Sequence, residues 1–394
     1  MLGQLGNLGN LGFGGGGNIS SPYGVTWNES TDTYAAINGV ENYLDSVVPC
    51  LVTPGSEGTG DIVLNPLDYT KRADTGATVA LDGSQGQVMM RFPKFYYSYS
   101  YSGSSHSYKA SLLPFAGSSV HPWFNKSGDG VTFLPYRYIG VYPAVGYSGG
   151  TYQDGDGANA WFNKSTGKIG SIAGKKCLTY ISRPNLRSAA SRIGTGWSLI
   201  DFWGYSALKL LYITKYKNFN SQAVLGAGNT QFAGFNFASC ISATGKVKSK
   251  SASGQSTVNG NSGDYANLFG IEDLWGGVFQ WVDGWNINNG NNYVCSNPSN
   301  FADGTTTNYT AYGVTNQTTT GWQNTLQQNV GFLPASLGAT SVTKITDYYY
   351  SSSSGTAPVF GGRANDGSAC GVFFLGADNN ALVVWPNFGG RVQY

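Results

Sequence analysis

Short apolar runs, each ended within a few residues by glycine, asparagine or aspartate, limit how this chain can fold. Glycine supplies 57 of the 394 residues, about twice its usual share. The closing stretch shows the pattern most clearly: VFGGRANDGSACGVFFLGADNNALVVWPNFGGRVQY, residues 359–394. Apolar runs of about four to eight residues between turn signals are typical of strands. The sequence therefore predicts many short strands joined by loops.

Two segments depart from this pattern and predict helices. In residues 198–218, Ser198 and Asp201 form a capping pair. Five apolar residues then fall on one face of that helix: Leu199, Trp203, Ala207, Leu210 and Leu211. Residues 184–194 predict a shorter helix, with Pro184 at its start and Gly194 at its end. The expected fold class is α+β, with mainly antiparallel strands and long loops packed on two central helices.

Charge is sparse, and this excludes several classes of partner. Only 11% of the residues are charged and the net charge is +2, so we expect no nucleic-acid partner. No apolar run approaches the ~18 residues of a membrane span, and no positively charged segment precedes an apolar core at the N-terminus. We therefore expect neither membrane insertion nor a signal peptide. The 26 tyrosines, with Ser, Gly and Asn, are typical of neutral, hydrogen-bonding contact surfaces.

The N-terminal residues 1–17, MLGQLGNLGNLGFGGGG, form a separate Gly/Leu-rich segment. Its leucines recur every three residues, which is the period of neither a helix nor a strand: Leu2, Leu5, Leu8 and Leu11. One interpretation is a flexible tether. The other is a docking peptide whose leucines fill repeated pockets on a partner, which would fit threefold symmetry.

The residues that usually carry catalysis or bind metals are few and scattered. The five cysteines lie far apart, without metal-ligand spacing, and predict buried free thiols in a protein folded in a reducing cytoplasm: Cys50, Cys177, Cys240, Cys295 and Cys370. His121 is expected to be structural. Glu272 and Asp273 are adjacent, but neighbouring residues of a strand face opposite ways. We predict a protein that is not an enzyme.

Several blocks of the chain resemble tail-tip and tail-fibre proteins of tailed bacteriophages that carry a C-type-lectin-like domain. That domain is shared with formylglycine-generating-enzyme-like proteins and the variable proteins of diversity-generating retroelements. The blocks are YGVTWNESTDTY, LNPLDYTKR, GQVMMRFPKFYY, RYIGVYPAVGY, GWSLIDFWGYSALKLLYITKYKNFNSQAVLGAG, LFGIEDLWGGVFQWVDGW and the closing segment. The resemblance implies a β-rich part over 18–180 and a lectin-like part over 181–394. It also implies a final strand beside the N-terminal strand.

The resemblance further implies a display face near the C-terminus, where the variable residues of that family lie. Polar residues would project from a scaffold that Phe373, Leu375, Val383 and Trp385 hold. The receptor-binding residues implied are Arg363, Asn365, Asp366, Ser368, Phe373, Asp378, Asn379, Asn380 and Trp385. The alternative is that Asn, Asp and Gly simply form turns here, since turn chemistry explains NDG and DNN without a ligand.

Neither the cysteine motif of the formylglycine-generating relatives nor the histidine cluster of the iron-dependent ones occurs in this sequence. Sugar-binding C-type lectins use EPN-like and WND-like calcium motifs, which are also absent. The stretch DGWNINNGNN, residues 283–292, offers oxygen atoms of the kind that calcium prefers. Because no motif supports that site, we predict no cofactor.

Two functions follow as hypotheses. The first is a phage virion adhesin, a tail-tip or tail-fibre receptor-binding protein for a bacterial surface glycan or protein. It would be made in the host cytoplasm, attached to other virion proteins by its N-terminus and assembled as a homo-oligomer, by analogy a trimer, so that weak contacts add by avidity. The alternative is a structural virion protein of the same fold, such as a head fibre, decoration or baseplate component, without an essential receptor.

Overall fold

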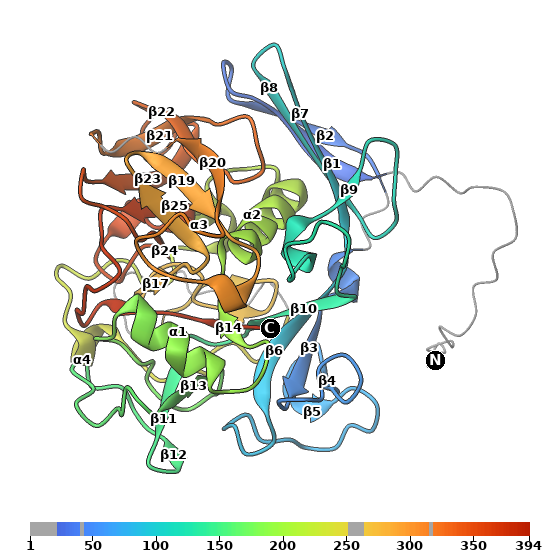
Figure 1. Ribbon diagram of the computed structural model, residues 1–394. Helices are drawn as coiled ribbons and strands as arrows, with labels where there is room; N and C mark the ends of the chain where they lie inside the picture. The colour runs from blue at the N-terminus through green and yellow to red at the C-terminus, as the bar shows by residue number, and fades with distance from the viewer. Residues whose placement is uncertain (1–21, 40–42, 251–263, 315–317) are drawn as a thin grey trace, which may run out of the picture.

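The computed structural model describes residues 22–39, 43–250, 264–314 and 318–394 (Figure 1). Short strands dominate these residues, and they pair antiparallel except for β17 with β26 and β23 with β25. The prediction of a mixed α+β protein with mainly antiparallel strands is therefore confirmed. The leucines of the predicted docking peptide, Leu2, Leu5, Leu8 and Leu11, lie outside the described residues.

A five-stranded antiparallel sheet forms an arm at the upper right of Figure 1. Its order is β2 (Thr33–Ile37), β1 (Tyr23–Asn28), β8 (Ser105–Ser111), β7 (Tyr96–Ser102) and β9 (Ser119–Val120). Tyrosine and serine alternate along β7 from Tyr97 onward, so Tyr97, Tyr99 and Tyr101 share one face. Tyr97 and Tyr99 pack from that face against the hydrophobic core. The alternation therefore anchors the arm to the rest of the protein.

A seven-stranded sheet holds the C-terminus in its interior. Its order is β14 (Ser198–Leu199), β27 (Val392–Gln393), β10 (Tyr136–Gly140), β6 (Gln87–Pro93), β3 (Val48–Val52), β4 (Ile62–Asn65) and β5 (Asp68–Arg72). The last strand thus lies between β14 and β10, whereas β1 pairs with β2 and β8. The expectation that the last strand lies beside the first is wrong. The two predicted parts, 18–180 and 181–394, share this sheet.

Buried Arg391 explains why the C-terminus is held inside this sheet. Its side chain is fully buried and donates hydrogen bonds to the carbonyl oxygens of Gly140, Val141, Glu272 and Asp273. A buried guanidinium must be satisfied in this way, because an unpaired buried charge is very costly. The residue just before β27 is thereby tied to segments that lie far away in the sequence.

A second seven-stranded sheet, at the left of Figure 1, carries the C-terminal half. Its order is β22 (Pro334–Leu337), β21 (Gly321–Leu326), β23 (Ile345–Ser351), β25 (Gly371–Ala377), β24 (Val359–Gly361), β17 (Phe279–Trp281) and β26 (Phe388–Gly389). All seven residues of β25 are buried. Both faces of this central strand are therefore covered, which suits its continuous apolar sequence.

Three small sheets complete the strand pairing. The first has the order β12 (Thr151–Tyr152), β11 (Val145–Ser148) and β13 (Lys168–Gly170). The second has the order β18 (Trp285–Asn288), β19 (Asn291–Val294) and β20 (Thr310–Val314), and the third joins β15 (Asn267–Leu268) to β16 (Ile271–Glu272).

Both predicted helices form, and the described residues contain two further short ones that were not predicted. Helix α1 covers Arg183–Ser191, with Pro184 in its first turn, and α2 covers Phe202–Tyr216. The additional helices are α3 (Ser221–Leu225) and α4 (Phe237–Cys240). The prediction of two helices is therefore corrected to four. The extra helices are only five and four residues long, too short to show helical periodicity in the sequence.

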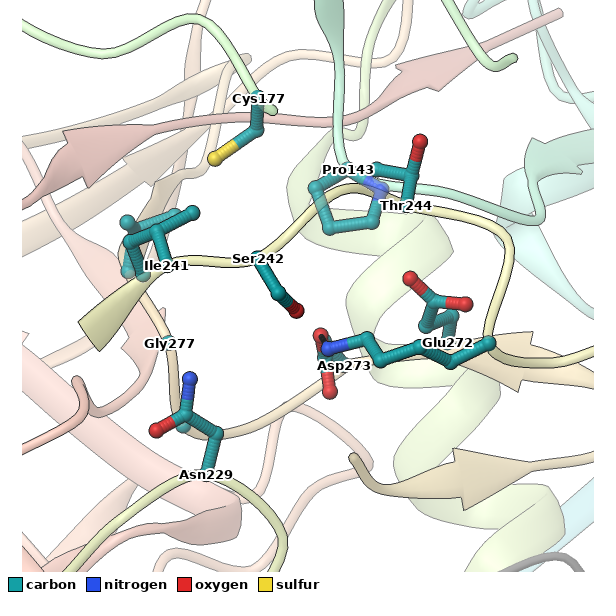
Figure 2. Close-up of a pocket in the computed structure, with 12 residues that line it drawn as sticks. Pro143, Cys177, Asn229, Ile241, Ser242, Thr244, Glu272, Asp273 and Gly277 are labelled. Carbon is teal, nitrogen blue, oxygen red and sulfur yellow. Dashed lines mark hydrogen bonds and ion pairs between the residues drawn. The ribbon is translucent and has the colours of Figure 1, made fainter. Parts of the chain in front are cut away.

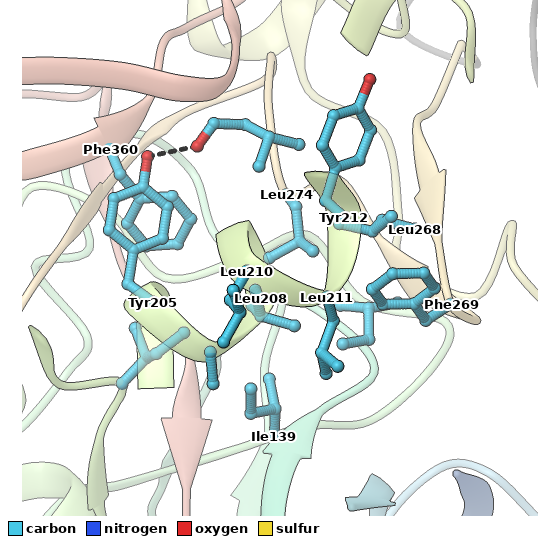
Figure 3. Close-up of a cluster of buried hydrophobic side chains, with 14 of the residues drawn as sticks. Ile139, Tyr205, Leu208, Leu210, Leu211, Tyr212, Leu268, Phe269, Leu274 and Phe360 are labelled. Carbon is cyan, nitrogen blue, oxygen red and sulfur yellow. Dashed lines mark hydrogen bonds between the residues drawn. The ribbon is translucent and has the colours of Figure 1, made fainter. Parts of the chain in front are cut away.

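Helix α2 is central rather than amphipathic. All but the last two of its 15 residues are buried, and Figure 3 shows Tyr205, Leu208, Leu211 and Tyr212 leaving the helix in different directions. The Tyr205 hydroxyl donates a 2.6 Å hydrogen bond to the carbonyl oxygen of Val372 in β25. Core side chains on several sides therefore enclose the helix, so the one-sided apolar face predicted from the sequence is wrong.

The prediction of buried free thiols is confirmed. All five cysteines are free and buried. No helix among the described residues is long and apolar enough to cross a membrane.

Candidate functional site

A hollow of about 160 Å³, open to solvent, lies on the second seven-stranded sheet. Three phenylalanines from three strands of this sheet form its apolar wall: Phe279 of β17, Phe374 of β25 and Phe388 of β26. The rings of Phe279 and Phe374 are stacked, with centroids 5.6 Å apart, and Phe388 lies 5.2 Å from Phe279. Concave sites with an apolar wall and a few polar groups are the usual form of a ligand site.

Polar side chains from two loops surround this wall. Arg363, in the turn after β24, donates a 3.0 Å hydrogen bond from Nε to Asp366 Oδ1, and its guanidinium lies 5.1 Å from the centre of the Phe279 ring. After β25, Asn379 Nδ2 donates a 2.7 Å hydrogen bond to Asp378 Oδ1. Burial raises the pKa of Asp366, although Arg363 opposes the shift. Asp378 has no ion-pair partner among the described residues.

Exposed apolar side chains form the rim. Trp385, which lines the hollow, is 59% exposed, and Leu382 in the same loop is 71% exposed. Tyr180 is 41% exposed, and its backbone N–H donates a 3.1 Å hydrogen bond to the carbonyl oxygen of Trp385. Exposed aromatic and aliphatic groups gathered beside a polar hollow are characteristic of binding surfaces.

Tyr180 adopts an unusual backbone conformation at this rim. Its φ is +54°, a left-handed value that costs a bulky residue roughly 1–3 kcal/mol and persists only where the surroundings impose it. Three residues later, the Arg183 N–H that begins α1 donates a 3.0 Å hydrogen bond to the carbonyl oxygen of Ala381. Residues 180–183 are thus held against the loop that carries Trp385.

The structure brings five of the nine predicted receptor-binding residues together around the hollow: Arg363, Asp366, Asp378, Asn379 and Trp385. Three others do not line it. Asn380 Oδ1 accepts a 2.9 Å hydrogen bond from the Leu382 N–H, which is a turn contact, Ser368 is exposed in a short 3₁₀ helix, and Asn365 is half-buried. For Asn380, the alternative of turn chemistry is the better description.

Phe373, the ninth predicted residue, faces away from the hollow. It is fully buried, and its ring packs 4.8 Å from Phe219 and 5.7 Å from Tyr212 of α2. Successive residues of a strand face opposite sides, so Phe374 contributes to the hollow and Phe373 to the core. Assigning Phe373 to the binding face is therefore corrected. Trp385, predicted both as scaffold and as a binding residue, is largely exposed and lines the hollow.

Several residues of the site escaped the sequence analysis. Phe279, Tyr350 and Asn387 line the hollow. Tyr180 and Leu382 are exposed beside it, the first hydrogen-bonded to Trp385 and the second in the same loop as Trp385. Tyr180 and Phe279 lie about 200 and 100 residues before Trp385 in the sequence. No local motif marks these positions, because only the sheet pairing and the loop contacts bring them together.

The stretch that offers oxygen ligands for calcium binds to the protein itself. Asp283 accepts hydrogen bonds from Arg187, Asn286 Oδ1 accepts one from Arg183 Nη2, and Asn292 Oδ1 accepts one from the Trp285 indole. Among the described residues, no group of three or more His, Cys, Asp or Glu side chains is placed to hold a metal ion. The stretch therefore serves to stabilise loops.

No protein-family model and no curated protein matches the chain.

Proposed function

We propose that this protein is a bacteriophage adhesin that binds a bacterial surface ligand in the hollow beside Trp385. The observation that carries the proposal is a largely exposed indole next to a hollow with an aromatic wall and a carboxylate, that of Asp378, which lacks an ion-pair partner in the described parts of the chain. An indole that stays exposed in an isolated chain loses its contact with water when a partner covers it, and tryptophan is among the residues that most often dominate binding energy. The resemblance to phage tail proteins supports the same reading.

The chemistry of the hollow favours a glycan over a protein as the ligand. The apolar face of a sugar ring stacks on an aromatic side chain such as Trp385. Sugar hydroxyls can donate to the Asp378 carboxylate and exchange hydrogen bonds with the amide of Asn379, both of which line the hollow. On this proposal the protein sits at a tail tip or fibre, as a homo-oligomer, by analogy a trimer, whose copies add their weak contacts by avidity.

A cell-binding assay with the full chain tests the proposal. Fluorescently labelled protein is added to a panel of bacteria, and binding of the wild type is compared with that of Trp385→Ala. Loss of a dominant aromatic contact costs about 2 kcal/mol or more, which is a decrease in affinity of roughly 30-fold. Leu67→Ala serves as the matched control, because Leu67 is 77% exposed and does not line the hollow.

Pretreatment of the cells separates the classes of ligand. Periodate, which cleaves vicinal diols, should abolish binding, whereas a protease should leave it unchanged. The reverse result would mean that the receptor is a protein. If wild type and Trp385→Ala bind cells equally, or if the chain binds only phage particles, the adhesin proposal fails. The second of these results would favour a structural virion protein.

A further inference from the structure

A second, smaller cavity lies where β16 ends, and Lys246, Glu272 and Asp273 are among the residues that line it. It has room for one water molecule, about 20 Å³. Figure 2 shows Glu272, Asp273 and Ser242 around it. The two carboxylates were expected to face opposite ways, but β16 ends at Glu272 and Asp273 has a φ of +51°. This left-handed turn brings both side chains to the same cavity, so that expectation is wrong.

An amine and a carboxyl group are in contact at this cavity. Lys246 Nζ lies 2.9 Å from Asp273 Oδ2, and the two side chains are only 15% and 11% exposed. The other carboxyl oxygen, Oδ1, accepts a 3.2 Å hydrogen bond from the Ala266 backbone N–H. Lys246 Nζ also donates a 3.2 Å hydrogen bond to the Asp264 carbonyl oxygen. Backbone groups therefore hold both the Lys246 amine and the Asp273 carboxyl group in place.

A third ionisable group, Glu272, adjoins this pair. It is fully buried, and its Oε2 accepts hydrogen bonds from the N–H groups of Gly245 and Val247, the residues on either side of Lys246. Its Oε1 has no hydrogen-bond partner among the residues that the structure describes. Burial raises the pKa of Glu272 to about 7, with Lys246 acting in the opposite direction. A carboxyl group with a pKa near neutrality can both donate and accept a proton under physiological conditions.

The backbone that carries the two acidic residues is rigidly held. Gln280 Nε2 donates a 2.7 Å hydrogen bond to the carbonyl oxygen of Asp273, and Arg391 Nη2 donates a 3.1 Å hydrogen bond to the same oxygen. Both donors are fully buried. Fixing two reactants in contact removes most of the entropic cost of their reaction. The amine, the carboxyl and the proton-transfer group are therefore preorganised.

We propose that Lys246 and Asp273 become joined by an intramolecular isopeptide bond between Nζ and Cγ. A proton passes from the Lys246 ammonium to Asp273 Oδ2 across their 2.9 Å contact, which leaves a neutral amine and a carboxylic acid. The amine attacks Cγ, and the Ala266 N–H stabilises the negative charge that develops on Oδ1. Glu272 takes a second proton from nitrogen through the one water that the cavity can hold and delivers it to Oδ2, which leaves as water as the Cγ–Oδ2 bond breaks.

The reaction balances without any additional reagent. An ammonium and a carboxylate become an amide and one water molecule, and nothing is oxidised or reduced. The cavity beside the pair has room for that one water. Burial lowers the pKa of Lys246, but the negative charges of Asp273 and Glu272 raise it above its usual value. The ammonium must therefore pass its proton to a group within the site before nitrogen can attack. The product is neutral, so burial no longer penalises the site.

Intact-mass spectrometry of the purified, denatured full chain tests the bond directly. The wild type should weigh one water molecule less than its sequence, and proteolysis should yield a branched peptide that joins Lys246 to Asp273. Lys246→Arg keeps the ion pair but cannot form the amide, so its mass should equal that of its sequence. Lys175→Arg is the matched control, because Lys175 pairs with Asp154 at the surface at 3.6 Å. It should still lose the water.

The rate of cross-linking tests the proton-transfer role of Glu272 separately. Glu272→Gln keeps the shape of the side chain but cannot relay a proton at neutral pH, so the cross-linked fraction should accumulate over hours instead of being complete at purification. Equal cross-linking in this variant would overturn the role of Glu272. A wild-type chain of full sequence mass, with Lys246 recovered in an ordinary linear peptide, would overturn the bond itself. Neither result depends on cell binding, so the adhesin proposal stands or fails separately.

Discussion

Acid should destabilise this protein through His121, a buried and neutral histidine. The side chain is fully buried, and its ring stacks on Phe95 with centroids 5.0 Å apart. Nδ1 accepts a 3.3 Å hydrogen bond from the Trp123 N–H, which places the ring proton on Nε2, 3.5 Å from Ser206 Oγ. A proton on Nδ1 would break the first bond and leave a charge among aromatic rings.

The magnitude follows from the pKa. Burial lowers the pKa of His121 from 6.5 to about 3, a difference worth about 5 kcal/mol at 1.36 kcal/mol per pH unit. Below pH 6.5 the unfolded chain binds this proton and the folded chain does not, so the unfolded state gains stability as the pH falls. The contribution of His121 to the free energy of unfolding is therefore intact above pH 6.5. It is lost progressively down to about pH 3.

Urea unfolding of the wild type and His121→Asn at pH 7, 5.5 and 4.5, followed by tryptophan fluorescence, measures this effect. Asparagine can still accept the Trp123 N–H as a helix cap, but it does not titrate. The variant should be less stable at pH 7 because packing is lost, and its stability should fall less steeply with acid, by up to about 1.4 kcal/mol per pH unit. Other titrating groups contribute equally to both chains. Parallel curves would refute the reasoning.

Two further predictions concern the core beside the site. Phe373→Ala should lower the free energy of unfolding by about 3–5 kcal/mol, because it opens a cavity in the core, whereas the largely exposed Trp385 should tolerate alanine with a loss of less than about 1 kcal/mol. Equal losses in urea unfolding would contradict the placement of Phe373 in the core and of Trp385 at the surface. Lys209→Met should lower the urea midpoint, with a loss of about 3–5 kcal/mol, because it removes the cation that faces the buried carboxyl of Asp347. A higher midpoint would contradict this.

Helix α2 shows how far the sequence constrained the fold. Its existence follows from its length and the absence of interrupting residues, and both are local properties. Its start is three residues later than expected: Asp201 is the N-cap and accepts a 2.7 Å hydrogen bond from the Gly204 N–H, while Ser198 belongs to β14. Ser198 pairs with Gln393 of β27. A strand contact almost 200 residues away decided the boundary, and periodicity cannot report such a contact.

The candidate site also contains some residues that the sequence could predict and others that it could not. Asp366, Asp378 and Asn379 could be predicted because polar residues that interrupt strands must lie in loops at the edges of a sheet. Which residues of β25 face the hollow could not be predicted. VFFLGA is apolar throughout, so no alternation of polar and apolar residues shows which side chains point to which face. Sequence reasoning chose Phe373 where the structure uses Phe374. Tyr180 carried no signal at all, since its strained conformation exists only against the loop of Trp385.

Buried arginine side chains explain how long loops can be held in the interior of this protein. The carbonyl oxygens of a buried loop have no neighbouring strand to supply hydrogen-bond donors. A guanidinium group offers five N–H donors to such oxygens. Arg391 binds four of them, and Arg183, also fully buried, donates to the carbonyl oxygens of Val282 and Trp285. Arg183 begins α1, next to the strained Tyr180, and Arg391 holds the segment that ends in Asp273. The same internal arginines thus fix the rim of the proposed receptor site and the proposed cross-link. Both therefore depend on interior charges rather than on surface ones.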